Sequence, residues 1–66
     1  MKVSVVFGDK LMQVKIKEGS TIEDALKKLG INTETVIVKR NSYITPIEEK
    51  VRDNDRIEII NVVSGG

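Results

Sequence analysis

The chain has 66 residues and a net charge of +1, from 11 lysines and arginines against 10 aspartates and glutamates. A chain of this length forms one domain and buries only about 60% of the surface that its unfolded form exposes, which argues against a deep substrate cleft. Basic residues alternate with acidic ones, and only one Tyr and one Phe are present. The composition therefore argues against nucleic acid as a partner.

The chain contains neither cysteine nor histidine. Disulfides and thiolate metal sites are thus excluded, and the commonest general base and the strongest nucleophile of enzymes are missing. No apolar run approaches the roughly 20 residues that span a bilayer, and the amino terminus has no signal-peptide core. We expect a soluble, cytoplasmic protein that is not an enzyme and has no membrane partner.

The first elements are two strands. Residues 2–7 and 11–17 both carry apolar side chains at every second position, and the short segment 8–10 between them begins with glycine. This pattern predicts a β-hairpin. Its buried face is expected to consist of Val3, Val5, Phe7, Met12, Val14 and Ile16.

A helix is predicted next, over residues 22–29. Thr21 is a suitable N-cap with Asp24 three positions later, although Ser20 with Glu23 offers a competing capping box. Gly30 is placed to end the helix in the left-handed conformation. Because a helix this short is marginal by itself, we expect it to lie across a sheet. The buried stripe of the helix is Ile22, Ala25, Leu26 and Leu29.

The second half reads as strands separated by turns. Pro46 should end a brief strand because it cannot donate to a central ladder, and segment 47–52 has no clear pattern. Asp53 and Asp55 are assigned to a turn rather than to a metal site, since a hard cation needs about six oxygen ligands. The predicted elements are a strand at 35–40, a turn at 41–42, a brief strand at 43–45, a turn at 53–55 and a last strand at 56–63.

These elements suit an α+β, single-domain β-grasp arrangement, a mixed sheet with one main helix packed on it. This arrangement requires the first and last strands to pair in parallel at the sheet centre, and periodicity alone does not determine that pairing. We expect residues 1–62 to form the β-grasp domain and residues 63–66 a flexible Gly-Gly tail. Four apolar residues fall outside the buried faces and are predicted to dock a partner: Val6, Leu11, Ile60 and Val62.

The sequence ends in Val62-Val63-Ser64-Gly65-Gly66. Glycine has no Cβ, so two in succession let the backbone enter a channel too narrow for side chains, with a carboxylate foremost. An enzyme can activate such a carboxylate. The alternative is that the end is merely frayed, as chain termini often are.

Several segments resemble the ubiquitin-like sulfur carriers of the ThiS/MoaD family, nearest to the carriers of thiamin biosynthesis. The carrying segments are the helix opening Thr21-Ile22, Asn41 followed by Ile44-Thr45-Pro46, the stretch Asp53-Asn54-Asp55-Arg56-Ile57-Glu58-Ile59, and Val63-Ser64-Gly65-Gly66. The order and spacing of these segments carry the resemblance, which covers nearly the whole chain.

The resemblance implies a substrate protein with no bound cofactor or metal. A ThiF/MoeB-like adenylyltransferase, which resembles ubiquitin-activating enzymes, would use ATP and Mg²⁺ to adenylate Gly66. A sulfur donor would then give the Gly66 thiocarboxylate, for delivery to a ThiG-like or MoaE-like synthase. In this scheme Gly65 and Ser64 allow the tail to thread into the partner.

Three functions remain open at this point. The first is a sulfur carrier, with thiamin thiazole assembly as the leading pathway and a MoaD-like molybdopterin synthase small subunit as the alternative. The second is a protein modifier joined through Gly66 to lysines of other proteins. The third is a β-grasp interaction module whose Gly-Gly end is incidental.

Overall fold

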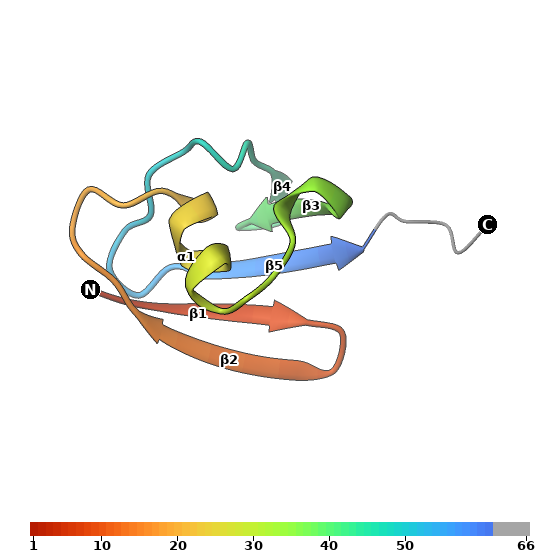
Figure 1. Cartoon of the computed structure of the whole chain (residues 1–66), viewed down its shortest axis with the longest axis horizontal. Helices are drawn as coiled ribbons and strands as arrows, with labels where there is room; N and C mark the ends of the chain where they lie inside the picture. The colour runs from red at the N-terminus through yellow and green to blue at the C-terminus, as the bar shows by residue number, and fades with distance from the viewer. Residues whose placement is uncertain (62–66) are drawn as a thin grey trace.

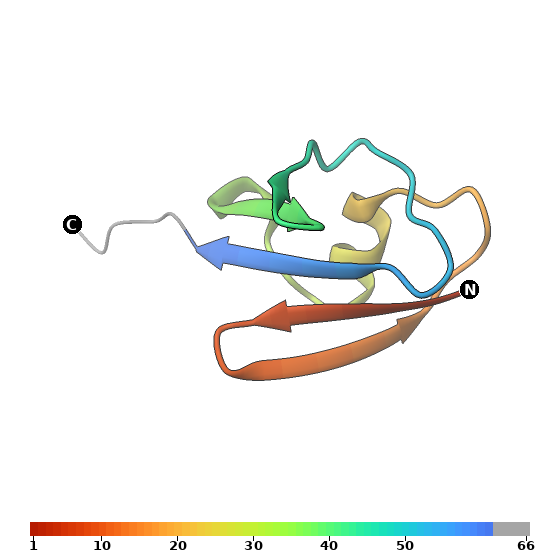
Figure 2. The ribbon, with the colours of Figure 1, turned by 180° about the vertical axis from the view of Figure 1, so that it is seen from behind.

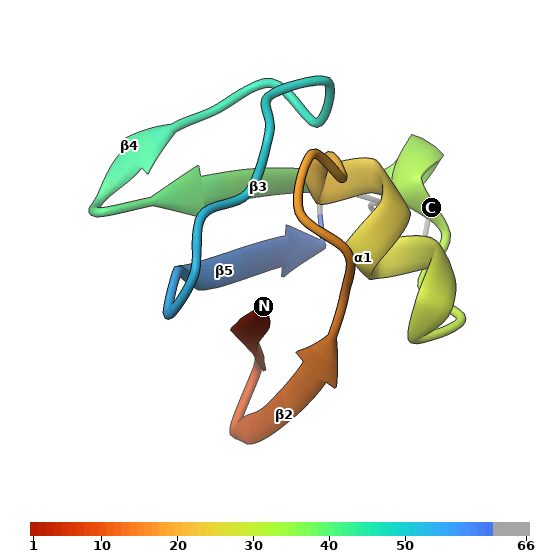
Figure 3. The same ribbon diagram turned by 90° about the vertical axis from the view of Figure 1, so that its left-hand side faces the viewer.

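The molecule consists of a five-stranded sheet with one helix across one face (Figures 1 and 3). The computed structural model describes residues 1–61, so the predicted tail at 63–66 and Val62 lie outside the described residues. We call the sheet face opposite the helix the open face. The elements are β1 (Lys2–Phe7), β2 (Lys10–Lys15), α1 (Ile22–Lys28), the 3-10 helix η1 (Thr33–Thr35), β3 (Val36–Arg40), β4 (Tyr43–Ile44) and β5 (Arg56–Asn61).

The strands lie in the order β2-β1-β5-β3-β4. β1 pairs antiparallel with β2 and parallel with β5, and β3 pairs antiparallel with both β5 and β4. The last strand is therefore central and has the first strand as its neighbour. This pairing, together with α1, confirms the predicted α+β class and β-grasp arrangement.

Backbone residues with positive φ lie in the predicted turns. Gly8, at φ 63°, opens the two-residue turn between β1 and β2. Asn41 and Ser42, at φ 53° and 70°, join β3 to β4, and two successive positive φ angles are the requirement of a type I′ hairpin turn. Asn54, at φ 66°, confirms the turn before β5. Asparagine tolerates this region better than most residues because its short side chain bonds locally.

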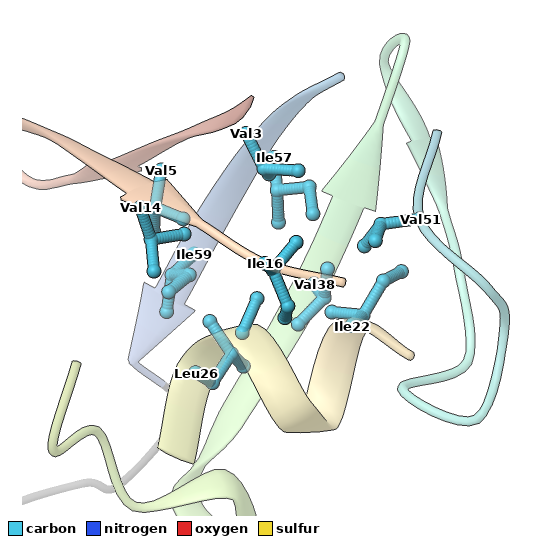
Figure 4. Close-up of a cluster of buried hydrophobic side chains, with 11 residues drawn as sticks. Val3, Val5, Val14, Ile16, Ile22, Leu26, Val38, Val51, Ile57 and Ile59 are labelled. Atoms are coloured by element: carbon cyan, nitrogen blue, oxygen red, sulfur yellow. The ribbon is translucent and has the colours of Figure 1, made fainter. Parts of the chain in front are cut away.

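The core lies between α1 and the sheet (Figure 4). Most strand residues of the alternating pattern meet the helix stripe there, as predicted, whereas Phe7, Met12 and Leu29 are only partly buried at the edge of the core. The described residues contribute no buried polar or charged side chain. Val51 is an addition to the predicted core, because segment 47–52 has no periodicity that marks it. The buried residues are Val3, Val5, Val14, Ile16, Ile22, Ala25, Leu26, Val38, Val51, Ile57 and Ile59.

Helix α1 begins at the predicted N-cap. The Thr21 Oγ1 accepts from the Asp24 N–H at 3.2 Å, and the Thr21 N–H donates to the Asp24 carboxylate at 3.0 Å. This reciprocal pair is a complete capping box, so Thr21 rather than Ser20 caps the helix. The segment before Val51 also helps to cap the helix. The backbone N–H groups of Ile22 and Glu23 have no partner within α1, and they donate to the carbonyls of Glu49 and Ile47.

The capping box predicts a pH dependence of stability. The Thr21 backbone and side-chain hydrogen bonds, with a smaller contribution from Lys27, hold the pKa of Asp24 below its ordinary value of 3.8. The ionised carboxylate therefore stabilises the fold above about pH 4, and this contribution is lost as the pH falls through the folded-state pKa. We expect Asp24→Asn to lower the urea midpoint at pH 7 but not near pH 2. If the urea midpoints of Asp24→Asn and the parent chain differed equally at both pH values, this role of Asp24 would be contradicted.

Some predicted boundaries differ from the structure. β3 begins at Val36 rather than at residue 35, because Thr33–Thr35 forms η1, capped by the side chain of Asn32. β2 spans Lys10–Lys15 instead of 11–17, and α1 ends at Lys28, with Leu29 as its C-cap. Among residues 1–61, no helix is long and apolar enough to cross a membrane.

Candidate functional site

The central strand leads to the predicted reactive tail. β5 lies between β1 and β3 (Figure 2), and its last described residue, Asn61, pairs with Val36 of β3. The predicted modified residue Gly66, the threading residues Gly65 and Ser64, and the predicted docking residue Val62 follow directly and lie outside the described residues. The end of β5 is thus held by β3 up to Asn61, while pairing with β1 ends at Ile59.

Three predicted docking residues share the open face. Val6 lies directly opposite Leu11 on β2, and it faces Glu58 on β5 across the parallel pair. Ile60, two positions beyond Glu58, points to the same face because strand side chains alternate. Leu11 is 61% exposed and Ile60 37% exposed. The structure therefore brings Val6, Leu11 and Ile60 onto one surface beside the end of β5.

Two further apolar residues on this face were missed by the sequence analysis. Ile37 lies opposite Ile60, and Ile44 lies opposite Lys39, which shares the open face with Ile37. The alternation within residues 36–40 marks Ile37, whereas Ile44 could be placed only once the pairing of β4 was known. We define the open-face patch as Val6, Leu11, Ile37, Ile44 and Ile60.

Charged residues cross the open-face patch. Lys39 and Glu58 are direct cross-strand neighbours, with Arg56 on the same side of β5. These three line a shallow hollow of about 220 Å³, together with Val6, Asn41 and Ser42. An apolar surface interrupted by charges of both signs is suited to docking a protein, because the charged residues can fix register while apolar contacts supply affinity.

The two turn aspartates have structural roles. Asp55 Oδ2 accepts from the Arg52 N–H at 2.7 Å and lies 3.4 Å from the Arg40 guanidinium, which also donates to the Lys50 carbonyl at 2.8 Å. Asp53 Oδ1 accepts from the Lys2 N–H at 3.0 Å. These contacts tie the turn to β1 and β3, as expected of a turn. Within residues 1–61, no group of three or more acidic side chains is arranged to hold a metal ion.

Comparisons with known proteins agree on family and fold. The model of the ThiS family matches residues 6–66. The chain is 33% identical over 54 residues to the sulfur carrier protein TtuB of Thermus thermophilus, an overlap of 82% of this chain and 83% of TtuB.

Two solved structures share the fold over the whole chain. SAMP1 of Haloferax volcanii superposes with a TM-score of 0.79 at 19% identity, covering 100% of both chains. The ubiquitin of Caldiarchaeum subterraneum superposes with a TM-score of 0.72 at 17% identity, covering 100% of this chain and 98% of that one. The match to the family model and the identity to TtuB show that the chain belongs to the ThiS family of ubiquitin-like sulfur carriers.

Proposed function

We propose that the Gly66 carboxylate of this sulfur carrier is activated by a partner enzyme and converted into a thiocarboxylate. A carboxylate oxygen attacks the α-phosphorus of ATP, forming an acyl adenylate and releasing pyrophosphate. A hydrosulfide-equivalent nucleophile then attacks the acyl carbon, and AMP leaves with the original oxygen. The partner, an adenylyltransferase resembling ubiquitin-activating enzymes, supplies ATP, Mg²⁺ and catalysis, and the carrier acts as its substrate.

The position of β5 carries this proposal. The strand is held by β1 as far as Ile59 and by β3 as far as Asn61, beside the open-face patch, and Gly66 lies five positions beyond Asn61. Five residues span at most about 17 Å. A partner docked on the open-face patch would then have the Gly66 carboxylate within reach of an ATP site inside it, while the folded domain stays outside.

Intact-mass measurement tests the proposed modification. The purified chain is incubated with ATP, Mg²⁺, sulfide and the cognate adenylyltransferase. We expect a mass gain equal to one oxygen replaced by sulfur, localised to Gly66 by fragmentation and dependent on ATP. An unchanged carboxylate with an enzyme that sulfurates another carrier in parallel would refute the proposal.

The leading acceptor is the synthase that assembles the thiazole of thiamin. We expect cells that lack this chain to require thiazole for growth. Loss of molybdenum-enzyme activity without a thiazole requirement would favour a molybdopterin synthase instead. A ladder of higher-mass conjugates, linked through Gly66 to lysines, would identify a protein modifier.

Docking through the open-face patch predicts a binding defect in Ile60→Glu. The new carboxylate would lose its hydration against an apolar partner surface, so we expect the carrier to bind the adenylyltransferase about tenfold more weakly or worse. Calorimetric titration measures this effect. Tyr43→Glu is the matched control, because Tyr43 is 77% exposed and pairs with Arg40, on the helix side of the sheet. Unchanged affinity in Ile60→Glu would place the docking surface elsewhere.

A further inference from the structure

The outer edge of β2 has unpaired backbone groups. β2 is the end strand of the sheet, with β1 on its inner side. The backbone of Ile16, just past β2, exchanges two 2.9 Å hydrogen bonds with Met1. The backbone N–H and C=O groups of the alternate residues Met12 and Val14 therefore also point toward β1. Leu11, Gln13 and Lys15 therefore direct their N–H and C=O groups outward, and none of the described strands pairs with them.

Lysines outnumber carboxylates along this edge. Lys10 begins β2 beside Asp9, and the far end carries Lys15, Lys17 and Lys28 beside Glu18. The Lys28 ammonium donates to the outward Lys15 carbonyl at 2.6 Å, which holds one positive charge at the edge. These far-end lysines and Lys2 line a hollow of about 540 Å³, in which Asp53 is the only acidic lining residue.

The charge of the edge selects its partner. The lysines at the far end of the edge favour a partner with carboxylates there. An extended segment with acidic ends meets this requirement. Its backbone can pair with Leu11 and Gln13, while its carboxylates lie beside the lysines.

We propose that the outer edge of β2 binds an extended, acidic segment of a partner protein by strand addition. This site uses the outward backbone groups of β2, whereas the proposed activation uses the tail and the side chains of the open-face patch, among them that of Leu11. A carrier with both surfaces can be held by one partner at β2 while another acts on its C-terminus.

The test uses a blocked synthetic peptide, Asp-Glu-Val-Thr-Ile-Thr-Val-Glu-Asp, titrated into the full chain and followed by amide NMR and hydrogen exchange. We expect saturable binding, with new protection of the Leu11 and Gln13 amides. A peptide with proline at the three aliphatic positions keeps the charge but cannot pair as a strand, and it should bind at least about tenfold more weakly. Equal binding of both peptides, or no binding of either, would overturn the proposal.

Gln13→Pro removes an outward N–H without touching the β1 ladder, and an edge strand tolerates proline there. We expect about a tenfold loss of peptide affinity in Gln13→Pro and none in Gln13→Ala, which keeps the amide. Retained Val14 and Ile16 amide protection will show that the hairpin of the proline variant is intact. If the proline variant misfolds, the double variant Lys10→Glu, Lys17→Glu gives the second test, and it should show the same loss of peptide affinity. Unchanged affinity in a folded variant would refute strand addition.

Discussion

Gly66→Val is expected to abolish ATP-dependent sulfuration. A β-branched side chain next to the reacting carboxylate would collide with a channel shaped for glycine, whereas the core lies within residues 3–59 and should not change. Intact-mass spectrometry after incubation with the adenylyltransferase, ATP, Mg²⁺ and sulfide should show no sulfur gain. Normal sulfuration of the variant would remove Gly66 from the proposed role.

Two controls locate the defect in Gly66→Val. Its thermal midpoint should match that of the parent chain, and its affinity for the adenylyltransferase should fall little, because the open-face patch is intact. Gly65→Val should show the same pattern if both glycines enter the channel. A large loss of affinity would instead mean that the tail supplies most of the docking energy.

Leu26→Ala is expected to destabilise the domain by about 2–5 kcal/mol. Leu26 is fully buried between α1 and the sheet, and a smaller side chain there leaves a cavity that neighbours fill only in part. A domain of this size loses roughly 4–8 °C in thermal midpoint per kcal/mol, so the midpoint should fall by roughly 8–40 °C. Thermal unfolding followed by circular dichroism measures the change.

Leu11→Ala is the matched control for Leu26→Ala. It removes the same atoms from a side chain that is 61% exposed, so the free energy of unfolding should change by only about 0.5 kcal/mol. Similar losses in the two variants would contradict the assignment of Leu26 to the core and Leu11 to the open face.

Local patterns predicted the elements because their causes are local. Alternation in residues 2–7, the Thr21 capping box and the left-handed Asn54 each depend on a few neighbouring residues. The resemblance to sulfur carriers supplied the parallel pairing of β1 and β5, which periodicity alone does not determine. Val51 could not be predicted, because it is buried by long-range contact in a segment without periodicity.

The candidate site was predictable to a similar extent. Val6, Leu11 and Ile60 were identified because each is apolar on the polar side of its strand. Ile44 depends on the β3–β4 register, in which it lies opposite Lys39. The predicted roles of Val62, Ser64, Gly65 and Gly66 lie outside the described residues and stay predictions.

The parallel pairing of β1 with β5 also affects folding during synthesis. Lys2–Phe7 leaves the ribosome before its inner neighbour, Arg56–Asn61, with the helix and two other strands in between. Until Arg56–Asn61 emerges, a nascent chain has the β1–β2 hairpin without the centre of its sheet, and an isolated hairpin is at best marginally stable. The sheet therefore cannot be completed until β5 has been synthesised. Chains arrested before residue 56 should be digested rapidly by protease, unlike the completed domain.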